Sequence, residues 1–142
     1  MKHALLLTVL FFTLNSINAQ NLSSFSVKKS TNLPEWFSNA ETTYTLNDER
    51  VVDYEDVQFI GGVNSEKGEI FFIDNKEIVF NESQIKIIKL KNIITKTLSF
   101  GDYRVKITFD TNSKTGAYTD GQISLFYKGM LQNKSRIYIN GY

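Results

Sequence analysis

Acidic side chains gather in one short stretch of the chain, and carboxylates are the groups best able to do chemistry in this sequence. The stretch holds five of them against a single arginine, Arg50: Asp48, Glu49, Asp53, Glu55 and Asp56. Paired carboxylates can act as general acid and base or bind a calcium ion. The spacing of these carboxylates matches no known catalytic or metal-binding motif. The stretch is typical of a loop or strand edge. We therefore interpret it as a solvated acidic face.

A second polar stretch, residues 110–116, begins like a calcium-binding loop. Asp110 and Asn112 occupy its first and third positions. Lys114 stands where the next ligand belongs, Thr115 replaces the glycine of the turn, and no glutamate closes the loop. A polar hairpin loop explains this stretch, so we predict neither a metal site nor a cofactor.

Composition excludes catalysis by imidazole or thiol groups. The chain has no cysteine, and its one histidine, His3, lies in a segment that we expect to be removed. Ser-His-Asp triads, thiol nucleophiles, zinc sites made of His and Cys, and disulfides are therefore excluded. The sequence also contains no nucleophile elbow and no glycine-rich phosphate loop. We predict no catalytic residues.

Lysines form a basic stretch with no acidic residue between Ser83 and Gly101: Lys86, Lys89, Lys91 and Lys96. If the stretch forms strands, some of these lysines would share a solvent-exposed face and form a local positive patch. Lysines at such positions commonly protect a sheet edge against association. Together with the acidic stretch they could instead define a dipolar binding surface.

Three aromatic residues are candidates for contact with a ligand or partner. Phe126 and Tyr138 alternate with the apolar residues of their own strands and so lie on the other face, which predicts a surface position. Trp36 could stack on a sugar or anchor a partner, but its phasing with Leu33 and Phe37 favours a plug over one end of the sheet. The candidate partner or ligand surface is Trp36, Phe126, Tyr138, Lys86 and Lys89.

Residues 1–19 are typical of an export signal. A short positive segment precedes the apolar run 4–14, and Ala19 stands before the polar Gln20. The run is too short for a spanning helix, which needs about 20 apolar residues. We expect cleavage after Ala19 and a secreted or periplasmic protein without a membrane span. An exported domain without disulfides also indicates a bacterial source.

Removal of the signal leaves 16 − 1 = 15 basic residues against 15 acidic ones. A formal balance of zero gives no general attraction to nucleic acid or to an anionic membrane surface. We therefore expect a partner that is an unidentified protein or small ligand, and no nucleic acid.

Period-two alternation of β-branched and aromatic residues dominates the rest of the chain. It is cleanest in 103–110, where Val105, Ile107 and Phe109 alternate with polar residues, and it returns in 122–127 and 136–140. Further strands are predicted at 24–29, at 57–63 and in a hairpin of 69–73 and 76–80 that turns at Asp74-Asn75. These segments predict an antiparallel meander.

Three segments leave alternatives. Residues 84–100 fit two strands turning at Lys91-Asn92 or one helix, and their β-branched content favours strands. Residues 32–40 predict one short helix, because Pro34 suits a first helical turn and the apolar residues share a face. A two-residue turn at Lys128-Gly129 would place Ile137 and Ile139 on the face of Phe126 instead of the apolar face of Leu125. Either the turn is longer or a β-bulge corrects the register.

These elements predict a single all-β domain, residues 20–142, after a signal peptide, residues 1–19. Its antiparallel meander of seven to nine strands would form a β-sandwich or a small closed β-barrel, with one short N-terminal helix. The function that fits best is an exported, non-catalytic binding or interaction module. The alternatives are a structural or accessory subunit of a surface assembly and, third, a carboxylate-based enzyme. A pocket would favour ligand binding, and an open edge strand would favour assembly.

Overall fold

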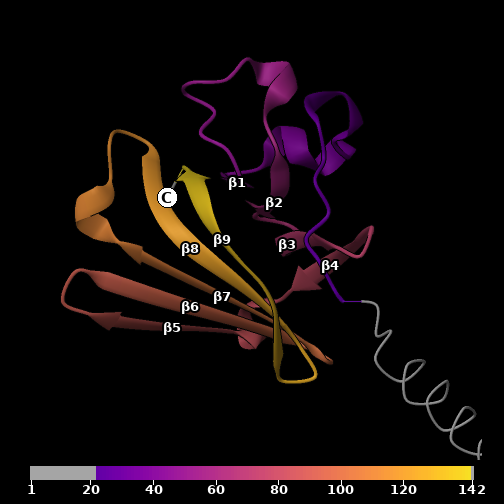
Figure 1. The fold of residues 1–142 in the computed structure, drawn as a ribbon, viewed down its shortest axis with the longest axis vertical. Helices are drawn as coiled ribbons and strands as arrows, with labels where there is room; N and C mark the ends of the chain where they lie inside the picture. Colours follow the sequence, from indigo (N-terminus) through magenta and orange to yellow (C-terminus); the bar gives the residue numbers. More distant parts are fainter. Residues whose placement is uncertain (1–21, 142) are drawn as a thin grey trace, which may run out of the picture.

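The computed structural model describes residues 22–141, so the predicted export signal, residues 1–19, lies outside the described residues. Nine antiparallel strands form one continuous sheet in the order β4-β3-β2-β1-β9-β8-β7-β6-β5 (Figure 1). The strands are β1 (Thr42–Thr45), β2 (Phe59–Asn64), β3 (Gly68–Ile73), β4 (Lys76–Phe80), β5 (Ile85–Leu90), β6 (Ile93–Phe100), β7 (Tyr103–Asp110), β8 (Tyr118–Tyr127) and β9 (Met130–Asn140).

The sheet is curled into a half-barrel. Consecutive strands pair with each other within β1–β4 and within β5–β9, and β9 also pairs with β1, which joins the two halves of the meander. Strands β4 and β5 are the two free edges and are linked by the 3₁₀ turn η4 (Glu82–Gln84). The all-β, antiparallel prediction is confirmed, and the strand number lies within the predicted range.

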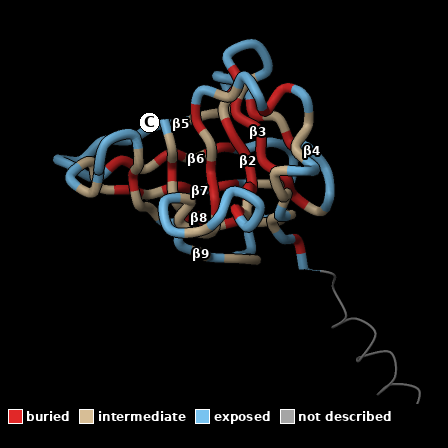
Figure 2. The backbone as a smooth tube through the Cα atoms, turned by 90° about the horizontal axis from the view of Figure 1, so that it is seen from above, coloured by how far each residue is buried: buried red, intermediate tan, exposed pale blue. Residues whose placement is uncertain are grey.

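The main core fills the space between the two halves of the curled sheet (Figure 2). Ile60 and Phe71 from the first half meet Leu98, Ile107 and Ile123 from the second half, and all five side chains are fully buried. Burial of aliphatic and aromatic side chains of this size contributes about 1.5–3 kcal/mol each. The inner face of the sheet therefore holds the fold together without a disulfide.

A second, smaller core lies on the outer face of β2 and β3. Trp36 and Phe37 cover Phe59, Ile70 and Phe72 from above that face. The two covering residues belong to η2 (Glu35–Asn39), a 3₁₀ turn that follows another one, η1 (Ser30–Asn32). Strands β2 and β3 are thus buried on both faces, which explains their continuous apolar sequence.

The predicted N-terminal α-helix is wrong. Residues 35–39 make five residues of 3₁₀ turn, closed by a hydrogen bond from the Ala40 N–H to the Phe37 carbonyl oxygen. The segment is too short to nucleate an α-helix, and Ser38 and Asn39 favour local turn hydrogen bonds. A 3₁₀ turn still lets the neighbouring Trp36 and Phe37 both point into the second core.

The hairpin and meander predictions are confirmed. Asp74 and Asn75 have φ angles of 51° and 61°, as a two-residue type I′ hairpin turn between β3 and β4 requires. Residues 84–100 form the strands β5 and β6, not a helix. Val105, Ile107 and Phe109 on β7 all point into the main core.

A β-bulge resolves the register between β8 and β9. Tyr127 pairs with Met130 and Phe126 with Leu131, but Leu125 pairs with Asn133, so the register shifts by one residue. This shift returns Ile137 and Ile139 to the inner face, where both are fully buried. The bulge is one of the two alternatives that the sequence left open, and the turn at Lys128-Gly129 keeps two residues.

Two strand predictions differ from the structure. Residues 24–29 were predicted as a strand but make only isolated bridges, Phe25 with Ile73 and Lys28 with Phe59, and Val27 is exposed. β1 was not predicted at all, although its Thr-Thr-Tyr-Thr sequence is rich in strand-favouring residues. Within residues 22–141, no helix is long and apolar enough to cross a bilayer.

A buried ion pair crosses the main core. Lys96 on β6 is 6% exposed and donates to both carboxylate oxygens of Glu69 on β3, at 3.2 and 3.1 Å. The Tyr44 hydroxyl on β1 donates to the same carboxylate at 2.6 Å. Lys96 does not lie on a solvent-exposed face or edge with the other lysines. Its side chain points to the inner face of the sheet, as those of Ile94 and Leu98 do.

Candidate functional site

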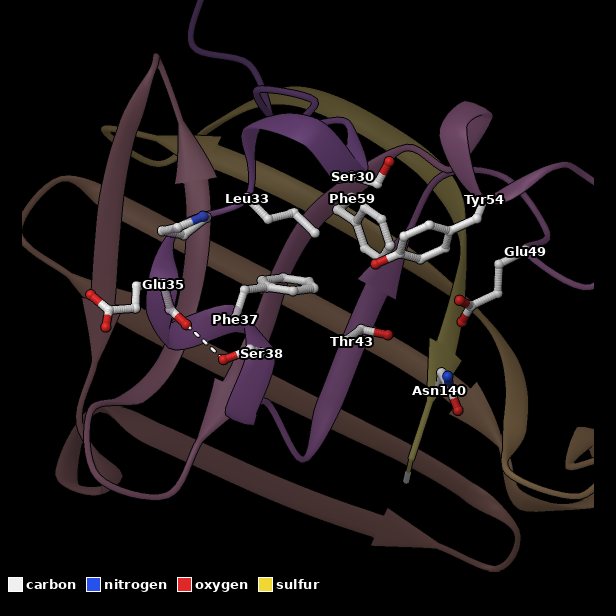
Figure 3. Close-up of a pocket in the computed structure, with 11 residues that line it drawn as sticks. Ser30, Leu33, Glu35, Phe37, Ser38, Thr43, Glu49, Tyr54, Phe59 and Asn140 are labelled. Carbon is white, nitrogen blue, oxygen red and sulfur yellow. Dashed lines mark hydrogen bonds between the residues drawn. The ribbon is translucent and has the colours of Figure 1, made fainter.

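A pocket of about 540 Å³ opens on the outer side of the sheet, between the 3₁₀ turns and the strands β1, β2 and β9 (Figure 3). The residues that line it come from η1, η2, the three strands, the loop after β1, and the 3₁₀ turn η3 (Tyr54–Asp56). The lining residues are Ser30, Leu33, Pro34, Glu35, Phe37, Ser38, Thr43, Glu49, Tyr54, Phe59 and Asn140.

Aromatic rings form the apolar part of the pocket. Phe37 and Phe59 pack edge to face, with ring centroids 5.0 Å apart, and both belong to the second core. Tyr54 stands edge-on to Phe59 at 6.0 Å and is 63% exposed, so its ring forms an outer wall. The two buried rings are held by packing from both sides, which gives the pocket a rigid floor.

Thr43 and Asn140 lie next to each other in the pocket because β1 pairs with β9. The two residues are directly opposite in that pairing, so their side chains project from the same face of the sheet. The Thr43 hydroxyl oxygen is buried and has no hydrogen-bond partner within residues 22–141. A buried polar atom of this kind is costly unless a ligand or water satisfies it.

Glu49 adds a half-buried carboxylate to the same side of the pocket. Burial raises the pKa of the Glu49 carboxyl, and the neighbouring Asp48 carboxylate raises it further. A hydrogen bond from Asn140 and the charge of Arg50 act in the opposite direction. Asn140 and Arg50 offset only part of the cost of burying this negative charge. A cation or a hydrogen-bond donor would therefore stabilise the carboxylate further.

Two of the described polar residues that line the pocket carry carboxylates, and the others carry hydroxyl or amide groups that can both donate and accept. Glu35 and Glu49 are acidic, and no lysine, arginine or histidine is among the described residues that line the pocket. Ser38 is occupied locally, since its hydroxyl donates to the Glu35 carbonyl oxygen at 2.9 Å. Figure 3 shows the Glu35 and Glu49 side chains at opposite ends of the pocket, with Phe37 and Thr43 between them.

None of the five candidate surface residues lines this pocket. Trp36 is buried beside it and donates from Nε1 to a Glu77 carboxylate oxygen at 3.1 Å, in the position of a plug. Lys86, Phe126 and Tyr138 all lie on the outer face of the second half of the sheet, but at different positions along the strands, since Phe126 pairs with Arg104 and Tyr138 with Asp120. Lys89 is exposed but is on the inner face of β5, where it pairs with Ile94.

The two acidic stretches have local structural roles. Asp48 forms an ion pair with Arg50 at 2.7 Å, and this pair lowers the pKa of the Asp48 carboxyl. Asp110 accepts a hydrogen bond from the Asn112 N–H at 2.8 Å. Across residues 22–141 no three His, Cys, Asp or Glu side chains lie close enough together to hold a metal ion. Of the acidic stretch, only Glu49 lines the pocket.

Nothing in the sequence pattern assigns Thr43, Glu49, Tyr54 or Asn140 to a common site. The missing signal was β1: without that strand, nothing places Thr43 beside Asn140. Glu49 and Tyr54 were hidden in a loop whose other acidic residues have no comparable environment. Comparison with protein-family models, curated proteins and solved structures finds no match to this chain.

Proposed function

We propose that this protein is an exported, non-catalytic binding module that holds a small organic cation in the pocket between η2 and β1. The observation that carries the proposal is the combination of an aromatic floor with carboxylates and no basic side chain. An amine or ammonium group attached to an apolar body matches both parts of the lining. The ligand would be secured by charge at Glu49 and by contact with the rings of Tyr54 and Phe37.

The charge of the lining supports a cation over a neutral or anionic ligand. Carboxylates only accept hydrogen bonds, so an ammonium group supplies donors for the Glu49 carboxylate. Aromatic faces attract cations by about 0.5–2 kcal/mol, depending on exposure. An anion at the same end of the pocket would be repelled by the Glu49 carboxylate.

The separation of the carboxylates supports a binding role over a catalytic one. Acid–base catalysis by two carboxylates needs both groups beside one reacting bond. Glu35 and Glu49 lie at opposite ends of the pocket instead (Figure 3). The raised pKa of Glu49 also follows from burial and from Asp48, not from a second catalytic carboxylate.

Titration with protonated benzylamine tests the proposal directly, with the neutral isostere ethylbenzene and the anion benzoate as comparison ligands. We expect the cation to bind and Glu49→Gln to weaken that binding at least tenfold by calorimetry. Glu55→Gln removes an exposed carboxylate in the same region and should change the affinity less than twofold. Equal binding of cation and benzoate, or equal effects of the two variants, would refute a cation site at Glu49.

The same titration should depend on pH in a defined direction. Because the pKa of the Glu49 carboxyl is raised, that group protonates earlier than an ordinary glutamate as the pH falls. Cation affinity should therefore decrease on acidification at a higher pH than an ordinary glutamate would give, and Glu49→Gln should remove this dependence. A flat pH profile for the wild-type protein would contradict it.

A structural subunit that assembles through β5 is the second candidate function. β5 is a sheet edge with no backbone hydrogen bonds beyond β6 among the described residues, and Ile88 and Leu90 on it are 45% and 72% exposed. A second copy paired antiparallel about Ile88 would place Lys86 opposite Leu90, so no two lysines would face each other. Such a pairing extends the sheet from one copy to the next.

Light scattering on a size-exclusion column tests assembly through β5. We expect the wild-type protein to dimerise with rising concentration and Ile88→Lys/Leu90→Lys to stay monomeric. Leu22→Lys/Val51→Lys changes two equally exposed apolar residues elsewhere and should leave the dimer intact. A wild-type protein that is monomeric at every concentration would exclude this second candidate.

A further inference from the structure

The outer face of β5–β9 carries a row of basic and hydroxyl side chains that neither the core nor the pocket uses. Strand register sets this row, because residues paired across neighbouring strands project from the same face. Each pairing in it is given by the sheet: Lys86 with Thr97, Thr97 with Lys106, Lys106 with Ser124, and Ser124 with Lys134.

The three lysines of this row are regularly spaced, and their positive charges form no ion pair with the described acidic residues. They occupy alternate strands, and neighbouring strands are about 4.7–4.9 Å apart, so successive lysines are about 9–10 Å apart across the sheet. Lys86, Lys106 and Lys134 are all exposed, and none forms an ion pair within residues 22–141. The chain as a whole is close to neutral, so this row concentrates positive charge on one face.

Two arginine–aromatic stacks flank the row. The Arg104 guanidinium lies 4.5 Å from the centre of the Phe126 ring, and that of Arg136 lies 5.1 Å from the Tyr138 ring. Such cation–π contacts hold each guanidinium beside an aromatic ring on the outer face of the sheet. Asp120 offsets part of this charge, since it pairs with Arg136 at 2.8 Å.

The residues between the cations are neutral and polar. Thr97 and Ser124 separate the lysines of the row, and Thr95, Thr108 and Gln122 form the next row along the strands. Hydroxyl and amide groups can both donate and accept, which suits the hydroxyl groups of sugars. Regular cations with intervening hydroxyls therefore favour a linear ligand that has both repeating anions and hydroxyl groups.

We propose that the outer face of β5–β9 binds a linear acidic polysaccharide through Lys86, Lys106 and Lys134. Carboxylate or sulfate groups of the polysaccharide would pair with the lysines, and the Phe126 ring, two residues along β8 from Ser124, would contact one of its sugar rings. This site is separate from the cation pocket, and it gives Lys86 and Phe126 a shared role. Binding is electrostatic and falls steeply with salt.

Fluorescence anisotropy with labelled alginate, heparin and neutral dextran tests this proposal on the full protein. We expect alginate or heparin to bind and dextran not to bind. Lys86→Gln/Lys106→Gln/Lys134→Gln should weaken binding at least tenfold and reduce its salt dependence. The matched control is Lys67→Gln/Lys76→Gln/Lys114→Gln, which removes the same charge from exposed lysines elsewhere and should weaken binding less than threefold.

Three outcomes would overturn the proposal. Equal losses in the two triple variants would mean that net charge, not this row, determines binding. Tighter binding of single-stranded DNA or of phosphatidylglycerol vesicles than of either acidic polysaccharide would assign the face to another class of partner. No binding of alginate or heparin at low salt would leave the row as an ordinary solvated surface. A circular dichroism melt of each variant confirms that it is folded.

Discussion

Lys96→Met is expected to lower the free energy of unfolding by about 3–5 kcal/mol, because it leaves a carboxylate buried without its cation. Glu69 is only 4% exposed, and both of its carboxylate oxygens accept from Lys96. The Tyr44 hydroxyl remains as a donor at 2.6 Å, but a neutral hydroxyl does not balance a full charge. Urea denaturation of the variant at pH 7 measures the loss.

A double variant separates the cost of the unpaired charge from the cost of a new side chain. Lys96→Met/Glu69→Gln removes both charges, and the amide that replaces the carboxylate can still accept from Tyr44. We expect the double variant to regain at least half of the stability lost by Lys96→Met, since similar replacements of buried ion pairs are often neutral. A double variant as unstable as the single one would show that packing around Lys96, not charge, dominates.

This ion pair illustrates what the sequence could and could not predict about the core. The inward phase of β6 was readable, because Ile94 and Leu98 alternate with threonines. Lys96 stands in that same phase, so alternation alone would have placed it inside. Its charge argued for solvent instead, and its partner Glu69 is 27 residues away on the other half of the sheet. Only the curling of the sheet brings the two together.

Local patterns predicted most of the strands because each has one buried face or a distinctive turn. The hairpin at Asp74-Asn75 and the alternation of β7 required no knowledge of distant residues. β1 is short, and its burial depends on β2 and β9, which lie on either side of it. The N-terminal apolar residues were correctly expected to be covered, but packing on β2 and β3 selected a 3₁₀ turn where phasing suggested an α-helix.

The pocket was harder to predict than the fold for the same reason. Its polar residues come from η1, η2, β1, the segment between β1 and β2, and β9, so several separate parts of the chain must fold before they meet. The outer lysine row depends in the same way on the register of five strands. Sequence alone identified Lys86, Phe126 and Tyr138 as surface residues, whereas their arrangement follows from the pairings of β5 to β9.

Ile107→Ala is expected to cost about 2–5 kcal/mol of unfolding free energy, because it removes three carbons from the middle of the main core. Ile107 is fully buried, on the central part of β7, between Lys96 of β6 and Ile123 of β8 in the sheet. The neighbouring strands hold the cavity open, since a backbone paired on both sides cannot collapse into the space left. Paired urea melts of the variant and the wild-type protein give the difference.

Thr108→Ala is the matched control, one residue further along the same strand. Thr108 faces outward, is half-buried and pairs with Thr95 and Gln122 on the outer face. Its replacement should cost well under half of the Ile107→Ala loss, because the methyl group and hydroxyl that it removes are only partly buried in the folded protein. Comparable losses in the two variants would mean that both faces of β7 are buried. The outer face of β5–β9 would then not be free to bind a polysaccharide, so this pair of melts also tests the surface on which that proposal depends.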